Sequence, residues 1–184
     1  MASEDIVKDL ISRRSFLNIS GSMDHFLKSA PGCPKVGWTW LRAIDLNLEQ
    51  GRRLGGYEVC QFCGKEQIRF VHYLKHRDWK EVIATGRICA SELSGTSQAD
   101  GEERKLRNYA QRRTNFLKLK GWQKSAKGNP WISFQDHHIV LLRRRDGKFK
   151  LQIDGEFGSM VFPDERAAKL RAFDVVMRKI HKGR

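Results

Sequence analysis

Three cysteines and two histidines lie close together in the first half of the chain. Cys60 and Cys63 are separated by two residues and followed by a glycine, and His72, His76 and Cys89 come next along the sequence. Thiolates and imidazoles are ligands that zinc prefers. A Cys-x-x-Cys pair can place both sulfurs on one ion, and the following glycine permits a tight turn. This spacing predicts one structural Zn²⁺ ion.

A closed structural zinc site needs four ligands, and these residues offer two sets. One is Cys₃His, with Cys89 and one histidine; the other is Cys₂His₂, with both histidines and Cys89 left over. We favour Cys₃His because Cys89 precedes a predicted helix start, where the positive end of the helix stabilises a thiolate. A regular hairpin over residues 68–87 would hold both histidines several rungs from Cys89. Either the hairpin is irregular or the loop over residues 76–80 folds back, and for this reason His76, beside the loop, is preferred to His72.

The order of a Cys-x-x-Cys-Gly knuckle, a two-stranded segment and a cysteine at a helix start resembles the treble-clef group of zinc fingers. The resemblance covers residues 57–94 and implies a small zinc-binding α+β module. Treble-clef fingers take two ligands from the helix start, where this chain offers Cys89 alone. The fourth ligand therefore stays open between His72 and His76.

The competing interpretation is that these residues are unconnected: a redox Cys-x-x-Cys pair, two surface histidines and a buried cysteine. A thioredoxin-like motif belongs in a βαβ pattern, which does not surround Cys60. Cys33, between a glycine and a proline, is expected to be a free thiol. The acidic N-terminal segment is unlike a secretory signal, so we expect an intracellular, reducing location in cytoplasm, nucleoid or nucleus.

Basic side chains are concentrated in the second half of the chain. The whole sequence has 35 Lys and Arg against 21 Asp and Glu, a formal charge of +14. Residues 1–100 have a net charge of +2 and residues 101–184 a net charge of +12. Like charges repel unless a polyanion neutralises them. Nucleic acid is the predicted partner, with an acidic protein or an anionic membrane surface as competitors; no apolar run approaches the ~18–20 residues that span a bilayer.

Two candidate phosphate-binding surfaces follow from this charge. In the first, a helix and turn, cations alternate with four aromatic residues that either stack on unpaired bases or belong to the core. The second is the tip and solvent-exposed face of a hairpin, which can lie along a nucleic-acid backbone or enter a groove. The cations of the first are Arg104, Lys105, Arg107, Arg112, Arg113, Lys118, Lys120, Lys124 and Lys127, among Tyr109, Phe116, Trp122 and Trp131; those of the second are Arg143, Arg144, Arg145, Lys148 and Lys150.

The elements that must position these residues form a predicted α+β fold. An N-terminal zinc-finger module resembling a treble clef is followed by an antiparallel β-meander closed by one amphipathic helix. In residues 1–56, a helix over 3–19 precedes an irregular segment in which 38–46 forms a strand or a short helix. The remaining segments are 57–94, the zinc module; 95–128, a basic linker helix after a polar loop that ends at Gly101; and 129–184, a β-β-β-α domain.

Strict alternation of apolar and polar residues from Lys148 to Ile153 predicts a strand with one buried face and one solvent-exposed face. The strand before it covers residues 137–142, and Asp146-Gly147 suits a two-residue turn between the two. A third strand is predicted over 158–162. Pro163 then opens a helix with an apolar stripe. The stripe consists of Leu170, Phe173, Met177 and Ile180.

Asp136, His137 and His138 form the other histidine cluster. A nuclease of the ββα-metal kind uses a strand-end histidine with a metal ligand on the following helix. His137 and His138 begin a strand whose next three residues are apolar, and the predicted closing helix supplies acids but no asparagine, so we interpret them as an exposed pair beside a basic hairpin. The sequence thus predicts a zinc-stabilised, non-enzymatic nucleic-acid-binding protein, for DNA or RNA. A metal-dependent nuclease and an adaptor for an acidic protein remain the alternatives.

Overall fold

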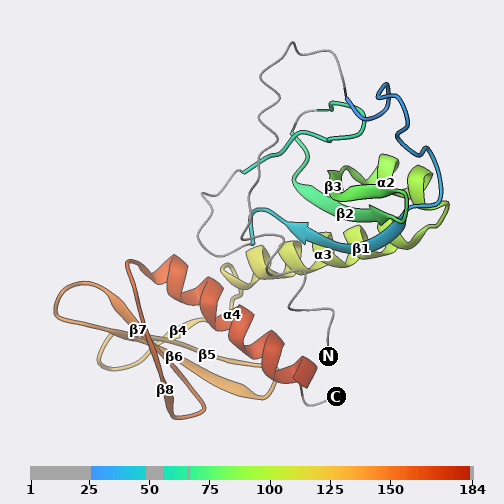
Figure 1. Cartoon of the computed structure of the whole chain (residues 1–184). Helices are drawn as coiled ribbons and strands as arrows, with labels where there is room; N and C mark the ends of the chain where they lie inside the picture. The colour runs from blue at the N-terminus through green and yellow to red at the C-terminus, as the bar shows by residue number, and fades with distance from the viewer. Residues whose placement is uncertain (1–25, 49–55, 66, 183–184) are drawn as a thin grey trace.

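The computed structural model of the chain describes residues 26–48, 56–65 and 67–182. Within them the chain is mixed α and β, with three helices and two antiparallel sheets (Figure 1). Each sheet belongs to its own hydrophobic core, and a long helix runs between the two. The helix predicted over residues 3–19 lies outside the described residues.

The first unit contains a three-stranded sheet in the order β1-β2-β3 and one short helix. The strands are β1 (Thr39–Asp45), β2 (Phe70–His76) and β3 (Trp79–Thr85), and the helix is α2 (Arg87–Ser94). The segment that the sequence left open between strand and helix is therefore a strand. Its neighbour Trp38 is almost fully buried, in a core completed by Leu46, Val71, Leu74, Ile83 and Leu93.

The second unit is a five-stranded meander in the order β4-β5-β6-β7-β8, closed by α4 (Glu165–Lys182). The alternation predicted for the middle strand is confirmed: Phe149, Leu151 and Ile153 are buried against the helix, and Lys150 and Gln152 are more exposed. Phe173 and Met177 of α4 fill the core beneath the sheet. The strands are β4 (Gln123–Lys124), β5 (Pro130–Phe134), β6 (His137–Arg143), β7 (Phe149–Ile153) and β8 (Glu156–Phe162).

This sheet differs from the three-stranded prediction in its strands and turns. Strand β4 has two residues, too few to show the alternation of apolar and polar residues that predicts a strand. Asp146-Gly147 is not a two-residue turn: Arg144 pairs with Lys148 across a three-residue loop in which Gly147 has φ 78°. The two-residue Asp-Gly turn lies instead at Asp154-Gly155, where both residues have positive φ, as the twist of a tight hairpin requires.

Helix α3 (Gln98–Phe116) connects the two cores. The sequence predicted a polar loop up to Gly101, but the helix begins earlier because Ala99 is fully buried in the first core. Asp100 in the first turn accepts hydrogen bonds from Arg87 and Ser91 of α2. At the other end Phe116 is buried in the second core, and the helix stops there, before the end of the predicted linker segment at residue 128.

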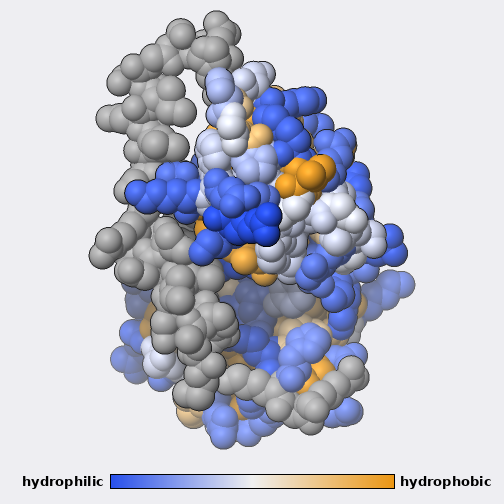
Figure 2. All heavy atoms as spheres, turned by 45° about the vertical axis from the view of Figure 1, so that its right-hand side comes forward, coloured by the Kyte–Doolittle hydropathy of each residue, from blue (hydrophilic) through white to orange (hydrophobic). Residues whose placement is uncertain are grey.

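Among the described residues, no helix is both long and apolar enough to cross a bilayer. Hydrophilic residues dominate the face drawn in Figure 2, where apolar residues are visible only as small separate patches.

Candidate metal centre and cationic surface

Cys60, Cys63 and Cys89 come together in the first unit. Their three sulfurs all lie within 4.8 Å of one another, although Cys89 is distant from the pair in sequence. Tetrahedral zinc with Zn–S bonds of ~2.3 Å would place its sulfurs ~3.8 Å apart, so small side-chain adjustments suffice to bind one ion. All three cysteines are free thiols. The cluster can therefore hold a metal ion.

The knuckle that carries Cys60 and Cys63 is fixed by backbone hydrogen bonds. The amide of Gly64 donates to the carbonyl of Cys60 over 2.8 Å, and Gly64 has φ 77°, a conformation that favours glycine. The Gln61 amide donates to Ala84 at the end of β3. The knuckle is thus attached to the hairpin that leads into α2.

Helix α2 positions Cys89 in its first turn, where the helix dipole favours a negative sulfur. The preceding Gly86 amide donates to the Cys60 sulfur over 3.5 Å. Burial raises the pKa of Cys89, and its contacts with the other two thiols raise it further. Burial also acts to raise the pKa of Cys63, but hydrogen bonds from the Lys65 amide and the other cysteines bring it below its ordinary value. One thiolate is therefore favoured within the cluster, as expected where three sulfurs share a small space.

Neither predicted histidine reaches the three sulfurs. His72 is fully buried: its Nδ1 accepts a hydrogen bond from the Trp40 indole over 3.2 Å, and its Nε2 lies 3.1 Å from Glu103 Oε2. Both ring nitrogens are occupied, which leaves no lone pair for a metal. His76 Nδ1 accepts from the Asp78 amide, and its ring packs against Trp38.

Cys33 is buried in the same core but outside the group of three sulfurs. Burial raises the pKa of its thiol. It is a free thiol, as the sequence predicted.

The second histidine cluster has a structural explanation. His137 Nδ1 lies 2.7 Å from Asp154 Oδ2, which also contacts Lys179 Nζ of α4 at 3.2 Å. The hydrogen bond from His137 lowers the pKa of Asp154 to about 2. These contacts tie the start of β6 to the β7–β8 turn and the closing helix. Within the described ranges, three metal-ligating side chains gather only at the cysteine cluster.

The candidate cations fall into two groups. Several of them have carboxylate partners: Lys105 pairs with Glu102, Arg107 with Glu103 and Arg144 with Asp146. Arg112 donates to the Met177 sulfur. Apart from Arg113, which pairs with Asp174, the others are accessible and form no ion pair with another described residue. They are Arg104, Lys118, Lys120, Lys124, Lys127, Arg143, Arg145, Lys148 and Lys150.

Arg113 and three of the four aromatic residues of the first candidate surface belong to the fold. Arg113 forms a two-pronged ion pair with Asp174 of α4, at 2.7 and 2.8 Å, and Tyr109 donates to the same carboxylate. Phe116 is buried, and the Trp122 indole donates to its carbonyl.

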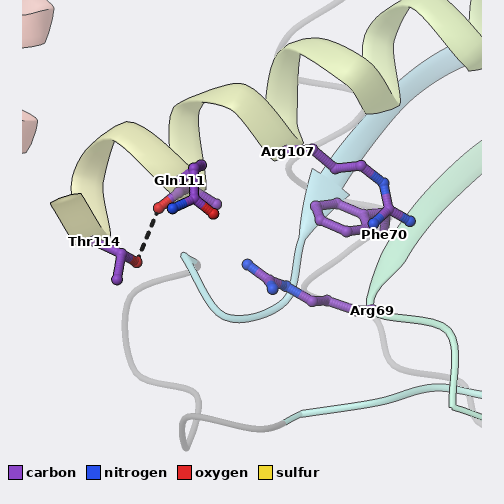
Figure 3. Close-up of a pocket in the computed structure, with 6 residues that line it drawn as sticks. Arg69, Phe70, Arg107, Gln111 and Thr114 are labelled. Carbon is purple, nitrogen blue, oxygen red and sulfur yellow. Dashed lines mark hydrogen bonds between the residues drawn. The ribbon is translucent and has the colours of Figure 1, made fainter.

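A shallow hollow lies between α3 and the start of β2 (Figure 3). The guanidinium groups of Arg69 and Arg107 stack on Phe70, 4.8 and 4.5 Å from the ring centre. Because Asp45 holds Arg69 and Glu103 holds Arg107, the hollow is less positive than the hairpin tip. Its remaining lining residues are Ala110, Gln111 and Thr114.

Sequence reasoning missed the buried contact between His72 and Glu103. It joins β2 to α3, and Glu103 also accepts from Arg107 over 2.6 Å. Burial raises the pKa of Glu103, but the hydrogen bonds from His72 and Arg107 outweigh it, and the net pKa is lowered. A glutamate on the otherwise apolar side of a predicted helix was the available signal.

Comparisons with family models, curated proteins and solved structures found no match to this chain.

Proposed function

We propose that the chain is a zinc-stabilised, non-enzymatic nucleic-acid-binding protein. Its first unit would be a treble-clef-like module in which Cys60, Cys63 and Cys89 supply three of the four ligands that a closed structural zinc site needs. Because such sites rarely exist in the unfolded chain, metal binding adds directly to folding stability.

The observation that carries the proposal is the set of accessible cations without carboxylate partners in the second half of the chain. Arg143, Arg145 and Lys148 cluster at the β6–β7 hairpin and lie on its exposed surface. Such a concentration of charge favours a polyanion, and phosphate contacts of this kind give affinity with little sequence selectivity.

The hairpin provides a direct test. The triple variant Arg143→Gln, Arg145→Gln, Lys148→Gln should bind a fluorescently labelled oligonucleotide more weakly. The plot of log K against log salt concentration should also become shallower, by roughly 0.7–0.9 for each phosphate that the variant no longer neutralises. Fluorescence anisotropy at several salt concentrations measures both effects.

Arg77→Gln is the control for loss of an exposed cation elsewhere, because Arg77 is exposed but pairs with Asp78 in the first unit. It should leave affinity and salt slope unchanged. Equal effects of the triple variant and the control would contradict the proposal.

A further inference from the structure

The five-stranded sheet has one face that α4 does not cover. Side chains on neighbouring strands share a face where they pair directly. Ile132, Ile139 and Ile153 pair across β5, β6 and β7 and are buried against the helix. The residues that alternate with them point to the opposite side of the sheet.

One row of residues on that opposite face crosses all five strands. Trp131 pairs with Val140, Val140 with Gln152, and Gln152 with Phe157. On the outer strand Gln123 pairs with Trp131. Two aromatic rings therefore stand on one row, three strands apart, or ~14 Å at the usual strand spacing. This separation is large enough for each ring to contact a different base.

The ring of Phe157 is accessible to a ligand. Its exposed fraction is 61%, which is high for phenylalanine in a strand, and the Lys150 ammonium lies 5.3 Å from the ring centre. Trp131 is partly exposed and packs against the ring of His138 at 5.3 Å. Aromatic rings beside cations are the combination that binds a base and its phosphate together.

The charge of this face favours a polyanion. The row above contains no carboxylate, and neither does the row of Leu142, Lys150 and Val161. On the other side Ser133 pairs with His138, whose backbone bonds to Asp154, and that carboxylate is paired with His137 and Lys179. The cationic β6–β7 hairpin continues from the same strands. A double helix would meet the cations but hides the faces of its bases, whereas a single strand can offer both phosphates and bases.

We propose that the α4-free face of the five-stranded sheet is a stacking platform for the unpaired bases of single-stranded nucleic acid, with Phe157 and Trp131 as its rings. The proposal rests on the proposed function, because it takes nucleic acid as the partner and assigns the strand state and the surface. Stacking is worth ~1–3 kcal/mol for each base, so the loss of one ring weakens binding roughly five- to 150-fold.

The test compares single-stranded and duplex oligonucleotides of one sequence, each as DNA and as RNA, by fluorescence anisotropy at fixed salt. Phe157→Ala should weaken single-strand binding within that range and change duplex binding less than twofold. Trp131→Ala should act in the same direction. Val161→Ala, which removes an exposed apolar side chain without a ring from the same face, is the matched control and should change neither affinity.

Phe157 is exposed, so its variant should keep the melting temperature of the native chain. If the native chain binds both single strands and duplexes, and Phe157→Ala leaves single-strand affinity unchanged, the stacking platform is overturned and the proposed function stands. Failure of the native chain to bind any of the oligonucleotides would overturn both. A dimer that Phe157→Ala converts to a monomer in sedimentation would assign this face to a second copy and also overturn the platform.

Discussion

The two units bury their cores with different residues. The first core includes small or sulfur-containing side chains, among them Cys60, Cys89, Ala90 and Ala99, around a three-stranded sheet. The second consists largely of aromatic and branched residues, with Phe116 packed against the rings of Phe173, Phe134 and Trp122. Both cores bury apolar side chains, but only the first contains a cysteine cluster that could hold a metal ion among the described residues. If the proposed zinc is bound, it adds to the stability of the first unit, whereas the second depends on apolar burial.

Loss of the metal should produce the largest difference between the units. Structural zinc sites contribute on the order of 10 kcal/mol to folding. Cys63→Ser or a strong chelator should therefore unfold the first unit while the second keeps its resonances in ¹⁵N-¹H spectra. Cys33→Ala, which removes a buried thiol outside the cluster, should retain one metal ion by mass spectrometry. Identical spectra with and without metal would contradict the comparison.

A cavity in the aromatic core should produce the next largest effect. Phe173 is almost fully buried and contacts the rings of Tyr109, Phe116 and Phe134. Phe173→Ala should lower the free energy of unfolding of the second unit by ~3–5 kcal/mol without changing metal content. Urea unfolding measures the loss. Loss of metal together with this unit would show that the two cores do not behave separately.

The buried contact between β2 and α3 should contribute less. Glu103→Ala leaves the Nε2 hydrogen of His72 without its acceptor and should cost the first unit ~1–3 kcal/mol. Glu103→Gln keeps an acceptor oxygen and should cost less. Urea unfolding of both variants separates hydrogen bonding from the loss of side-chain packing. Equal losses of unfolding free energy in the two variants would show that the negative charge of Glu103, and not its hydrogen bond or its packing, stabilises the first unit.

The smallest effect is the pH dependence at Asp154. Its folded pKa of about 2 lies below the unfolded value of about 4, so the ionised carboxylate stabilises the second unit above pH 4. This stability is lost as the pH falls from about 4 to 2. Solvent screens the side chain, which is 34% exposed, and limits the contribution to less than ~1 kcal/mol.

Asp154→Asn should therefore lower the melting temperature slightly at pH 6 and flatten its dependence on pH below 4. Thermal melts followed by circular dichroism across this range provide the measurement. Asp136→Asn, at the turn between β5 and β6, is the control for removal of an exposed turn carboxylate. A native melting temperature that does not change between pH 4 and pH 2 would contradict the assignment.

Regular patterns made the second unit predictable. Alternation from Lys148 to Ile153 and the stripe through Phe173 and Met177 identified β7 and α4, because both follow from the geometry of a single element. The short strand β4 carries no such pattern. The prediction of a two-residue turn at Asp146-Gly147 was wrong because the same dipeptide fits two- and three-residue loops, and only strand pairing distinguishes them.

The site was predictable only in part. Residue types and spacing predicted that Cys60, Cys63 and Cys89 would gather, because thiols near a helix start suit a metal. The positions of His72 and His76 depended on tertiary contacts: Trp40 and Glu103 come from distant elements and occupy both nitrogens of His72. A local pattern cannot show such partners.

The most direct test of the proposed function is the affinity of the metal-loaded native chain for an oligonucleotide as the salt concentration rises from about 50 to 200 mM. We expect binding at physiological ionic strength and a linear fall of log K with log salt, with a slope of several units. A polyglutamate chain of matched charge should bind more weakly. Tight binding of polyglutamate with no binding of any oligonucleotide would contradict the proposed function.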